Sequence, residues 1–266
     1  MKKRIGLREK NTVNSVPLTE RIEQYSQYLI DWLKQRVVIA KANGIIVGIS
    51  GGIDSALVAA LAKKAFPDNT LGVIMPIDSM SFDLDHIEQL KQNIHLNTVT
   101  IDLKNTFDSL FNTLNIDNKM AISNIKPRLR MTTLYALAQQ NNYLVAGTDN
   151  EDEVYIGYFT KFGDGGVDIL PISRLLKNEV QLLAKHLNVP QCIIDKKPSA
   201  GLWEGQSDED ELGFSYAELD NYLNNNKQIL NSNIKLKISR LHKATQHKRQ
   251  KAYQPKTIEQ FLKERN

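Results

Sequence analysis

Four short runs of apolar, mostly β-branched residues alternate with longer stretches that have the periodicity of amphipathic helices. The apolar runs span residues 44–50, 70–77, 97–103 and 143–148, and the helical stretches span residues 18–42, 54–66, 82–95 and 119–141. Because the runs are apolar enough to be covered on both faces, they predict parallel strands between layers of helices. The alternation therefore predicts an α/β fold with an open, mostly parallel β-sheet, in which ligands bind beyond the carboxyl ends of the strands.

Composition indicates a soluble globular protein in a reducing compartment. No repeat or low-complexity linker divides the 266 residues, so residues 1–266 are predicted to form one domain. The single cysteine, Cys192, excludes an internal disulfide and disfavours a cysteine-based metal site. The basic N-terminus is not followed by an apolar segment, and no run is long enough to span a membrane. We therefore expect a cytoplasmic protein with no membrane partner.

The net charge of +4 is distributed unevenly along the chain. Nine of the 34 basic residues lie between residues 221 and 258, where there is no Asp or Glu, and the other 25 are outnumbered by 30 acidic residues. A basic tail on an acidic body is compatible with nucleic-acid binding, with a solvated helix or with a clamp for a phosphorylated small molecule. Composition alone favours the solvated helix.

A glycine-rich loop with the sequence GISGGIDS separates the first apolar run from the next helical stretch. It comprises Gly48, Ile49, Ser50, Gly51, Gly52, Ile53, Asp54 and Ser55. Glycines let the backbone approach a ligand, and free N–H groups at a helix start attract anions. The Gly-Lys-Ser/Thr ending of a Walker A loop and the G-x-G-x-x-G of a dinucleotide fold are both absent. The alternative is a simple strand-to-helix turn with a serine cap.

The loop resembles the S-G-G-x-D-S phosphate loop of the N-type ATP pyrophosphatases, a group with a Rossmann-like, adenine nucleotide alpha hydrolase-like fold. A second segment, LVAGTDNEDEVYIGYFTKFGDGGVDILPISRLLKNEV at residues 144–180, resembles the ammonia-dependent NAD synthetases. Residues 126–131, 197–216 and 247–250 also match that family in order and spacing. The resemblance covers most of the chain from Gly44 onward and is much weaker before residue 18.

The resemblance implies a ligase that forms a C–N bond in the last step of NAD biosynthesis. In that family the carboxylate of deamido-NAD attacks the α-phosphate of ATP and pyrophosphate leaves, and ammonia then displaces AMP to give NAD. The family also implies Mg²⁺ and a homodimer with deamido-NAD near the subunit interface, to which the helices at 18–42 and 119–141 could contribute. By the same analogy, residues 18–200 are the ATP pyrophosphatase core and residues 215–266 are a basic helical segment.

The resemblance assigns the ATP and metal contacts to named side chains. Residues 48–55, Thr148, Lys177 and Ser199 correspond to ATP-binding positions, with Asp54 and Glu153 as Mg²⁺ ligands. Oxygen ligands suit a hard cation, and donors and Mg²⁺ would stabilise the charge that develops on the phosphates. Many relatives have threonine at the position of Ser199, which keeps the hydroxyl. Without the resemblance, Glu153 would be a surface carboxylate and Lys177 a solvated lysine.

The resemblance assigns deamido-NAD to a mainly basic set of residues: Arg128, Lys161, Asp168, His247 and Lys248. A pyrophosphate and a carboxylate need basic partners, so part of the basic tail is expected to cap the substrate rather than bind nucleic acid. Asp164, in the glycine-rich segment KFGDGGVD, could accept a proton from ammonium. An aspartate before two glycines is also a common turn residue, and the two roles are compatible.

Free ammonia is the expected nitrogen donor. A glutamine-dependent enzyme needs a glutaminase with a nucleophilic cysteine, whereas Cys192 lies in the apolar setting PQCIID and is better interpreted as core. Residues 199–213 are polar and long for a loop, so they could form a lid over ATP, with Trp203 packing it down or filling the core.

Two other functions remain open at this level. One is a different adenylating ligase, or a tRNA-modifying enzyme, on the same scaffold; the basic tail favours it, but the lack of a second cysteine argues against persulfide-based thiolation. The other is a non-catalytic ATP sensor, which would be expected to lose the metal carboxylates that are present here as Asp54 and Glu153.

Overall fold

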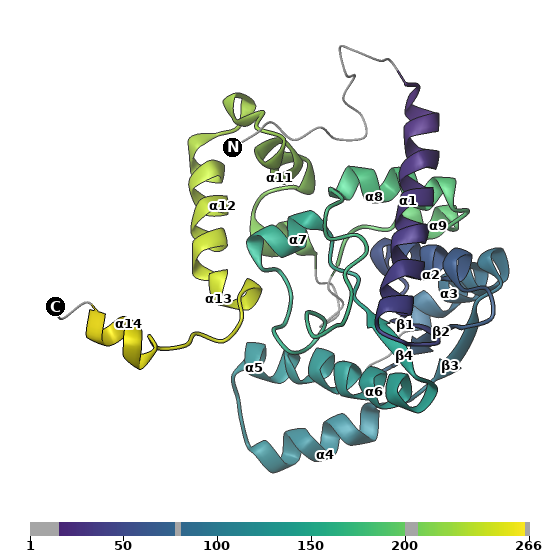
Figure 1. Cartoon of the computed structure of the whole chain (residues 1–266), viewed down its shortest axis with the longest axis horizontal. Coiled ribbons are helices and arrows are strands. Elements are labelled where there is room, and N and C mark those ends of the chain that lie inside the picture. Colours follow the sequence, from purple (N-terminus) through teal and green to yellow (C-terminus); the bar gives the residue numbers. More distant parts are fainter. Residues whose placement is uncertain (1–15, 78–80, 200–206, 264–266) are drawn as a thin grey trace.

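The computed structural model describes residues 16–77, 81–199 and 207–263, and its centre is a four-stranded parallel sheet. The strands are β1 (Gly44–Gly48), β2 (Thr70–Ile74), β3 (Asn97–Thr100) and β4 (Tyr143–Ala146), in the order β3-β2-β1-β4 (Figure 1). In the register, Ile46 of β1 lies opposite Leu71 of β2 and Val145 of β4. The predicted α/β fold with a parallel sheet is confirmed.

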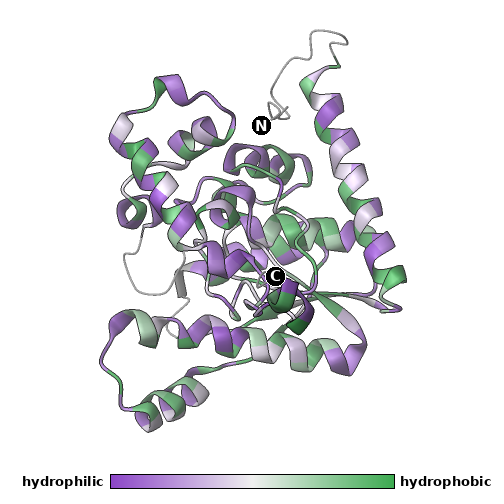
Figure 2. Ribbon diagram, turned by 60° about the vertical axis from the view of Figure 1, so that its left-hand side comes forward, coloured by the Kyte–Doolittle hydropathy of each residue, from purple (hydrophilic) through white to green (hydrophobic). Residues whose placement is uncertain are grey.

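Helices cover both faces of the sheet. One layer contains α1 (Leu18–Ile39), α2 (Ile53–Ala65), α3 (Ser81–Ile94), α8 (Lys177–His186) and α9 (Gln191–Ile194), and the other contains α4 (Lys104–Leu114) and α6 (Ile125–Asn141). Strand side chains alternate between the two layers. Ile45 and Val47 belong to the core cluster under α2, whereas Ile46 belongs to the cluster under α6. All three are fully buried, which explains the continuous apolar run, and apolar segments gather around the sheet in Figure 2.

The predicted element boundaries need three corrections. Each strand is shorter than its apolar run; β1 ends at Gly48, where the glycine-rich loop begins. The stretch expected as one helix at 119–141 is two helices, α5 (Lys119–Ser123) and α6, with Asn124 between them. Helix α4 was not predicted, although Phe107 and Phe111 stack on its inner face at helical spacing.

The C-terminal helices form a separate layer beside the sheet (Figure 1). They are α10 (Asp208–Leu212), α11 (Tyr216–Leu223), the 3₁₀ turn η1 (Lys227–Ile229), α12 (Ser232–Ala244), α13 (Gln246–Arg249) and α14 (Ile258–Lys263). A small hydrophobic cluster joins this layer to α7 (Glu151–Ile156); its buried members are Ile156, Leu212, Phe214, Leu219 and Ile238. Helix α7 is therefore one link between the sheet and the C-terminal helices, and the packing of α11 on α8 is another.

None of the helices in the described part of the chain could cross a bilayer. Helix α1 has 22 residues, enough for a span, but charged side chains occur along it from Glu20 to Arg36. Helix α2 is the more apolar of the two but has only 13 residues.

The core predicts a clear difference between two leucine substitutions. Leu57 on α2 is fully buried, whereas Leu236 on α12 is half exposed. Leu57→Ala should lower the free energy of unfolding by about 2–5 kcal/mol because it leaves a cavity beneath the sheet. Leu236→Ala is the matched control and should change it by less than about 0.5 kcal/mol. Urea titrations of both variants measure the difference; equal losses would contradict this description of the core.

Candidate active site

The glycine-rich loop turns directly from β1 into α2. Gly51 has φ +77°, a left-handed conformation, and a Cβ atom there would lie 2.9 Å from the Cβ of Asp83. The hydroxyls of Ser50 and Ser55 are 3.1 Å apart; Ser50 Oγ accepts from Gly52 N at 3.2 Å and Ser55 Oγ donates to Gly52 O at 2.9 Å. These bonds hold the turn at the N-terminus of α2, where backbone N–H groups can bind an anion.

Lys177, Asp54 and Glu153 meet beside this loop. The Nζ of Lys177 lies 2.6 Å from Asp54 Oδ2 and 3.3 Å from Glu153 Oε1, and its side chain is only 7% exposed. The residues come from the first turns of α8, α2 and α7, so three helix N-termini converge at the carboxyl ends of β1 and β4. Asn150 connects two of them: it donates from Nδ2 to Asp54 Oδ1 at 3.0 Å and forms a capping box with Glu153.

The carboxylates of this region outnumber its cations. Burial raises the pKa of Glu153 to about 7, against the pull of Lys177 and with a further push from Asp54. Burial also raises the pKa values of Asp149 and Asp152 well above the usual range, and neighbouring carboxylates add to the effect. Burial opposes the charge on Lys177, but Asp54 and Glu153 outweigh that opposition and raise its pKa. Such an environment favours an additional cation.

The donor set fits a Mg²⁺ ion that is shared with a phosphate. Asp54 and Glu153 supply carboxylate oxygens, the ligands that Mg²⁺ prefers. Within the described residues, no three His, Cys, Asp or Glu side chains form a complete metal cage. Two carboxylates completed by phosphate oxygens and water are the usual arrangement for Mg²⁺ at a nucleotide. Lys177 now occupies the space between them.

Most residues assigned to deamido-NAD lie together on the side of the C-terminal helices. Arg128 Nη2 donates to Lys161 O at 3.4 Å, and Lys161 Nζ donates to His247 O at 2.7 Å. Lys248 Nζ donates to the carbonyls of Gly157 and Phe159 at 2.8 and 2.7 Å. The structure thus brings Arg128, Lys161, His247 and Lys248 together. It also shows that the two lysines fasten the basic tail to residues 157–161, between the end of α7 and the start of the glycine-rich segment.

The two aspartates of that segment have different surroundings. Asp164 Oδ1 accepts from Thr160 N at 3.0 Å, and part of the residue is exposed. Desolvation of its carboxyl by the surrounding protein raises the pKa of Asp164. Backbone hydrogen bonds and the charge of Lys248 partly offset this rise. Asp168 accepts from Val145 N at 2.8 Å and from the Tyr135 hydroxyl at 3.0 Å. Asp168 therefore anchors the segment to β4 and α6, whatever else it binds.

The other two residues predicted to contact ATP, Thr148 and Ser199, lie outside the cluster of Lys177, Asp54 and Glu153. Thr148 is half buried, two residues after the end of β4. Ser199 is exposed at the end of a described stretch. The predicted lid spans residues 199–213. Its residues 200–206, which include Trp203, lie outside the described residues. The lid remains a prediction.

Sequence reasoning missed four buried polar residues of the site: Asp149, Asn150, Asp208 and Tyr216. For Asn150 a signal was present, because Asn followed three residues later by Glu is a capping-box pattern. Tyr216 of α11 contacts Glu153, and Asp208 of α10 contacts the same Tyr216 hydroxyl; no local pattern marks such long-range contacts.

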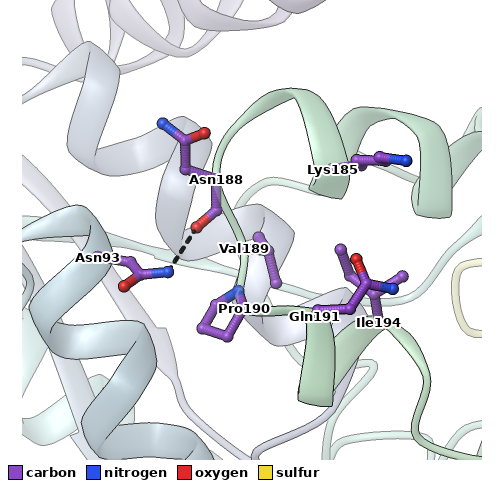
Figure 3. Close-up of a pocket in the computed structure, with 7 residues that line it drawn as sticks. All are labelled: Asn93, Lys185, Asn188, Val189, Pro190, Gln191 and Ile194. Carbon is purple, nitrogen blue, oxygen red and sulfur yellow. Dashed lines mark hydrogen bonds between the residues drawn. The ribbon is translucent and has the colours of Figure 1, made fainter.

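A hollow of about 480 Å³ lies elsewhere in the molecule, at the opposite end of α8 from Lys177 (Figure 3). Lys185, Asn188, Pro190 and Gln191 are among its lining residues, and Asn93 donates to Asn188 O at 3.2 Å. Its lining contains no carboxylate and none of the predicted site residues, so it is not the predicted site.

The comparison with protein families gives one match. The NAD synthase family profile matches residues 25–252. The chain belongs to the NAD synthase family. It is 56% identical over 241 residues to an NH₃-dependent NAD⁺ synthetase from Mycoplasmopsis pulmonis, covering 90% of this chain and 93% of that protein. The predicted family and its ligase class are confirmed.

Solved structures agree with the family. An NMN synthetase from Francisella tularensis has a TM-score of 0.84 and 40% identity, covering 89% of this chain and 99% of that one. An NH₃-dependent NAD synthetase from Campylobacter jejuni, in complex with nitrate, has a TM-score of 0.74 and 26% identity, covering 89% of this chain and 98% of that one. Both support the α/β fold of the family.

The glycine-rich loop provides a stability test with an internal control. Gly51→Ala should cost about 1–2 kcal/mol, because alanine is strained at φ +77° and its Cβ meets Asp83. Gly52 has φ −92°, and a Cβ atom there would lie 3.3 Å from Ser50 Oγ, its nearest neighbour. Gly52→Ala should therefore lower the free energy of unfolding by less than Gly51→Ala does. Urea unfolding without ATP measures both. A larger loss for Gly52→Ala would contradict the described turn.

Proposed function

We propose that this chain amidates deamido-NAD with free ammonia and ATP, and that the residues described above do the chemistry. The observation that supports the proposal is the meeting of a phosphate loop with Lys177, Asp54 and Glu153 at the carboxyl edge of the sheet, in a member of the NAD synthase family. Relatives named NH₃-dependent NAD⁺ synthetases share this activity, and their similarity extends over most of both chains.

In the first step the nicotinate carboxylate of deamido-NAD attacks the α-phosphate of ATP, and the bond to pyrophosphate breaks. The N–H groups at the start of α2, with Ser50 and Ser55, would hold the leaving pyrophosphate. Lys177, already buried beside the loop, would bring its positive charge to the phosphates. Thr148 and Ser199 would contact ATP at the edges of the site.

Asp54 and Glu153 would hold Mg²⁺ together with the phosphates of ATP. When bound, the ion neutralises charge on the triphosphate and on the departing pyrophosphate. The role of the chain is to present two carboxylates in a fixed arrangement. Asn150 provides it, because it hydrogen-bonds Asp54 and caps the helix that carries Glu153.

In the second step ammonia attacks the carbonyl carbon of the acyl-adenylate, and AMP leaves with the electrons of the broken C–O bond. At neutral pH ammonia is mostly present as ammonium, so a base must remove a proton before the nitrogen can attack. Asp164 is the proposed base, since its carboxyl has a raised pKa and lies in the same segment as Lys161 and Asp168. Arg128, Lys161, Asp168, His247 and Lys248 would orient the dinucleotide.

The assembly and location of the chain are part of the proposal. We propose a cytoplasmic homodimer without a nucleic-acid partner. Apolar side chains exposed on α1, α4 and α5 support a dimer contact: Tyr28, Val38, Ile39, Leu110, Leu114 and Met120. Scattered exposed apolar residues are common on monomers, so the molar mass in solution decides the point.

A mononucleotide is the second candidate substrate. The observation in its favour is the likeness to the Francisella tularensis NMN synthetase, at 40% identity and a TM-score of 0.84. The two activities share adenylation and amidation and differ only in whether the substrate carries an adenylate half. Parallel assays with deamido-NAD and nicotinic acid mononucleotide decide between them through the ratio of kcat/KM.

The central test is a mixing assay with Asp54→Asn as the loss-of-function variant. Wild-type protein with ATP, Mg²⁺, deamido-NAD and ammonium should give NAD, AMP and pyrophosphate. Asp54→Asn should slow pyrophosphate release by about 100-fold or more, because an amide cannot replace the carboxylate at Mg²⁺ and Lys177. Asp108→Asn, which alters an exposed ion pair with Lys104, is the control and should behave as wild type. Near-normal pyrophosphate release by Asp54→Asn would refute the metal assignment.

Asp164→Asn should separate the two steps. We expect near-normal pyrophosphate release but slow NAD formation, so that acyl-adenylate accumulates in single-turnover quench experiments. In the wild type, the amidation rate should rise with pH as Asp164 loses its proton, at a pKa above the ordinary value. The variant should lack this rise at the pKa of Asp164. Its amidation rate should recover in part only at high pH, where free ammonia is plentiful. Parallel loss of both steps without pH recovery would make Asp164 a turn residue or a substrate anchor.

A further inference from the structure

Tyr216 is buried where the C-terminal helices meet the ATP end of the site. It is 5% exposed and is the first residue of α11. Its hydroxyl lies 3.3 Å from Glu153 Oε1 and 3.0 Å from Asp208 Oδ2. The ammonium of Lys177 lies over its ring, 4.8 Å from the centroid. One side chain thus contacts both Glu153 and Lys177.

The position of Tyr216 is fixed by residues that do not belong to the site. Ser215 and Glu218 form a capping box at the start of α11, and the backbone N–H of Tyr216 donates to Glu209 Oε1 at 2.9 Å. Phe214 and Leu219, on either side in sequence, are buried in the hydrophobic cluster beneath α12. The ring therefore reaches Glu153 and Lys177 from a rigid support.

Asp208 fixes the direction of the Tyr216 hydroxyl. Its Oδ2 accepts from Tyr216, and its Oδ1 accepts from the hydroxyl of Tyr158 at 3.1 Å. The two tyrosines thus donate to opposite oxygens of one buried carboxylate. Each hydroxyl has one proton, which it shares between Asp208 and a second carboxylate: Glu211 Oε2 at 2.9 Å for Tyr158 and Glu153 Oε1 at 3.3 Å for Tyr216.

We propose that Tyr216 is a positioning residue for ATP activation, which holds Glu153 and Lys177 in the arrangement that receives the phosphates and Mg²⁺. A carboxylate that must share a cation with a phosphate needs a fixed orientation, which partners behind it usually provide. Asn150 holds the backbone of Glu153 through its side chain and the Oε2 oxygen through its own N–H at 3.2 Å. Tyr216 contacts the other oxygen, Oε1, which is also the one that Lys177 binds. The proposal rests on the proposed function of this site. It also assigns a catalytic purpose to α11, which supplies none of the predicted ATP contacts.

Tyr216→Phe and Tyr158→Phe form a matched pair for the test. Each removes one hydroxyl that donates to Asp208 and keeps a buried ring, but only Tyr216 reaches Glu153. Tyr216→Phe should raise the Mg²⁺ concentration for half-maximal pyrophosphate release and lower kcat, together by about 10–100-fold. The KM for deamido-NAD should stay within twofold or so, because Arg128 and Lys161 are untouched. Tyr158→Phe should leave the Mg²⁺ requirement unchanged.

Thermal unfolding of the full chain supplies a second readout that needs no turnover. Mg²⁺ and ATP together should raise the Tm of the wild type and of Tyr158→Phe by similar amounts, and that of Tyr216→Phe by clearly less. Equal Mg²⁺ requirements and equal Tm increments in the two variants would overturn the proposal and leave Tyr216 as packing for Asp208. If the wild type fails to amidate deamido-NAD, the proposed function fails, while the Tm comparison still decides whether Tyr216 positions the site.

Discussion

The ammonium of Lys177, buried between Asp54 and Glu153, is the interaction on which the site depends. An uncompensated carboxylate or ammonium at this depth would cost several kcal/mol, so none of the three could remain charged there alone. A lysine in the first turn of a helix is also opposed by the helix dipole. The acidic pair reverses that preference and draws the N-termini of α2, α7 and α8 to one point. Because Asp54 and Lys177 are 123 residues apart, the site exists only in the completed fold.

The parts that could be predicted from the sequence are those with local causes. Strands that are buried on both faces must be continuously apolar, and this makes them visible in the sequence. Each of the four apolar runs contains a strand. The glycine-rich loop consists of consecutive residues whose hydrogen bonds to one another define the turn. The pairing of Lys177 with Asp54 and Glu153 has no local signature. Those residues could be named only through family resemblance, and their roles toward ATP and Mg²⁺ stay predictions. The prediction that residues 1–266 form a single domain also stays a prediction.

The features that sequence reasoning missed depend on contacts between distant segments. The periodicity of residues 119–141 is nearly continuous, yet the helix breaks at Asn124, whose Oδ1 accepts from the hydroxyl of Thr160, the residue before the glycine-rich segment. Tyr216 likewise has the local appearance of an ordinary helix-start residue after a serine cap. Its importance comes from Glu153 and Lys177, which no periodic pattern connects to it.

Helix α7 connects the basic tail to Glu153. Its six residues are too few to be stable alone, so its partners must hold it in place. At its C-terminal end the last carbonyls need donors, and the tail supplies them: His242 contacts Tyr155 O, Thr245 donates to Ile156 O and Lys248 donates to Gly157 O.

The tail also packs closely against the end of this helix. A Cβ atom on Gly157 would lie 2.4 Å from Thr245, so the close approach requires glycine there. At the other end of α7, Asn150 caps the helix and Glu153 faces Lys177. Two basic residues of the tail, Lys248 and Arg249, thus bond to carbonyls at the end of the helix that presents Glu153. The proposed dinucleotide contacts of His247 and Lys248 would be made from this same support, so the proposed dinucleotide residues and the proposed Mg²⁺ ligand Glu153 are connected through α7.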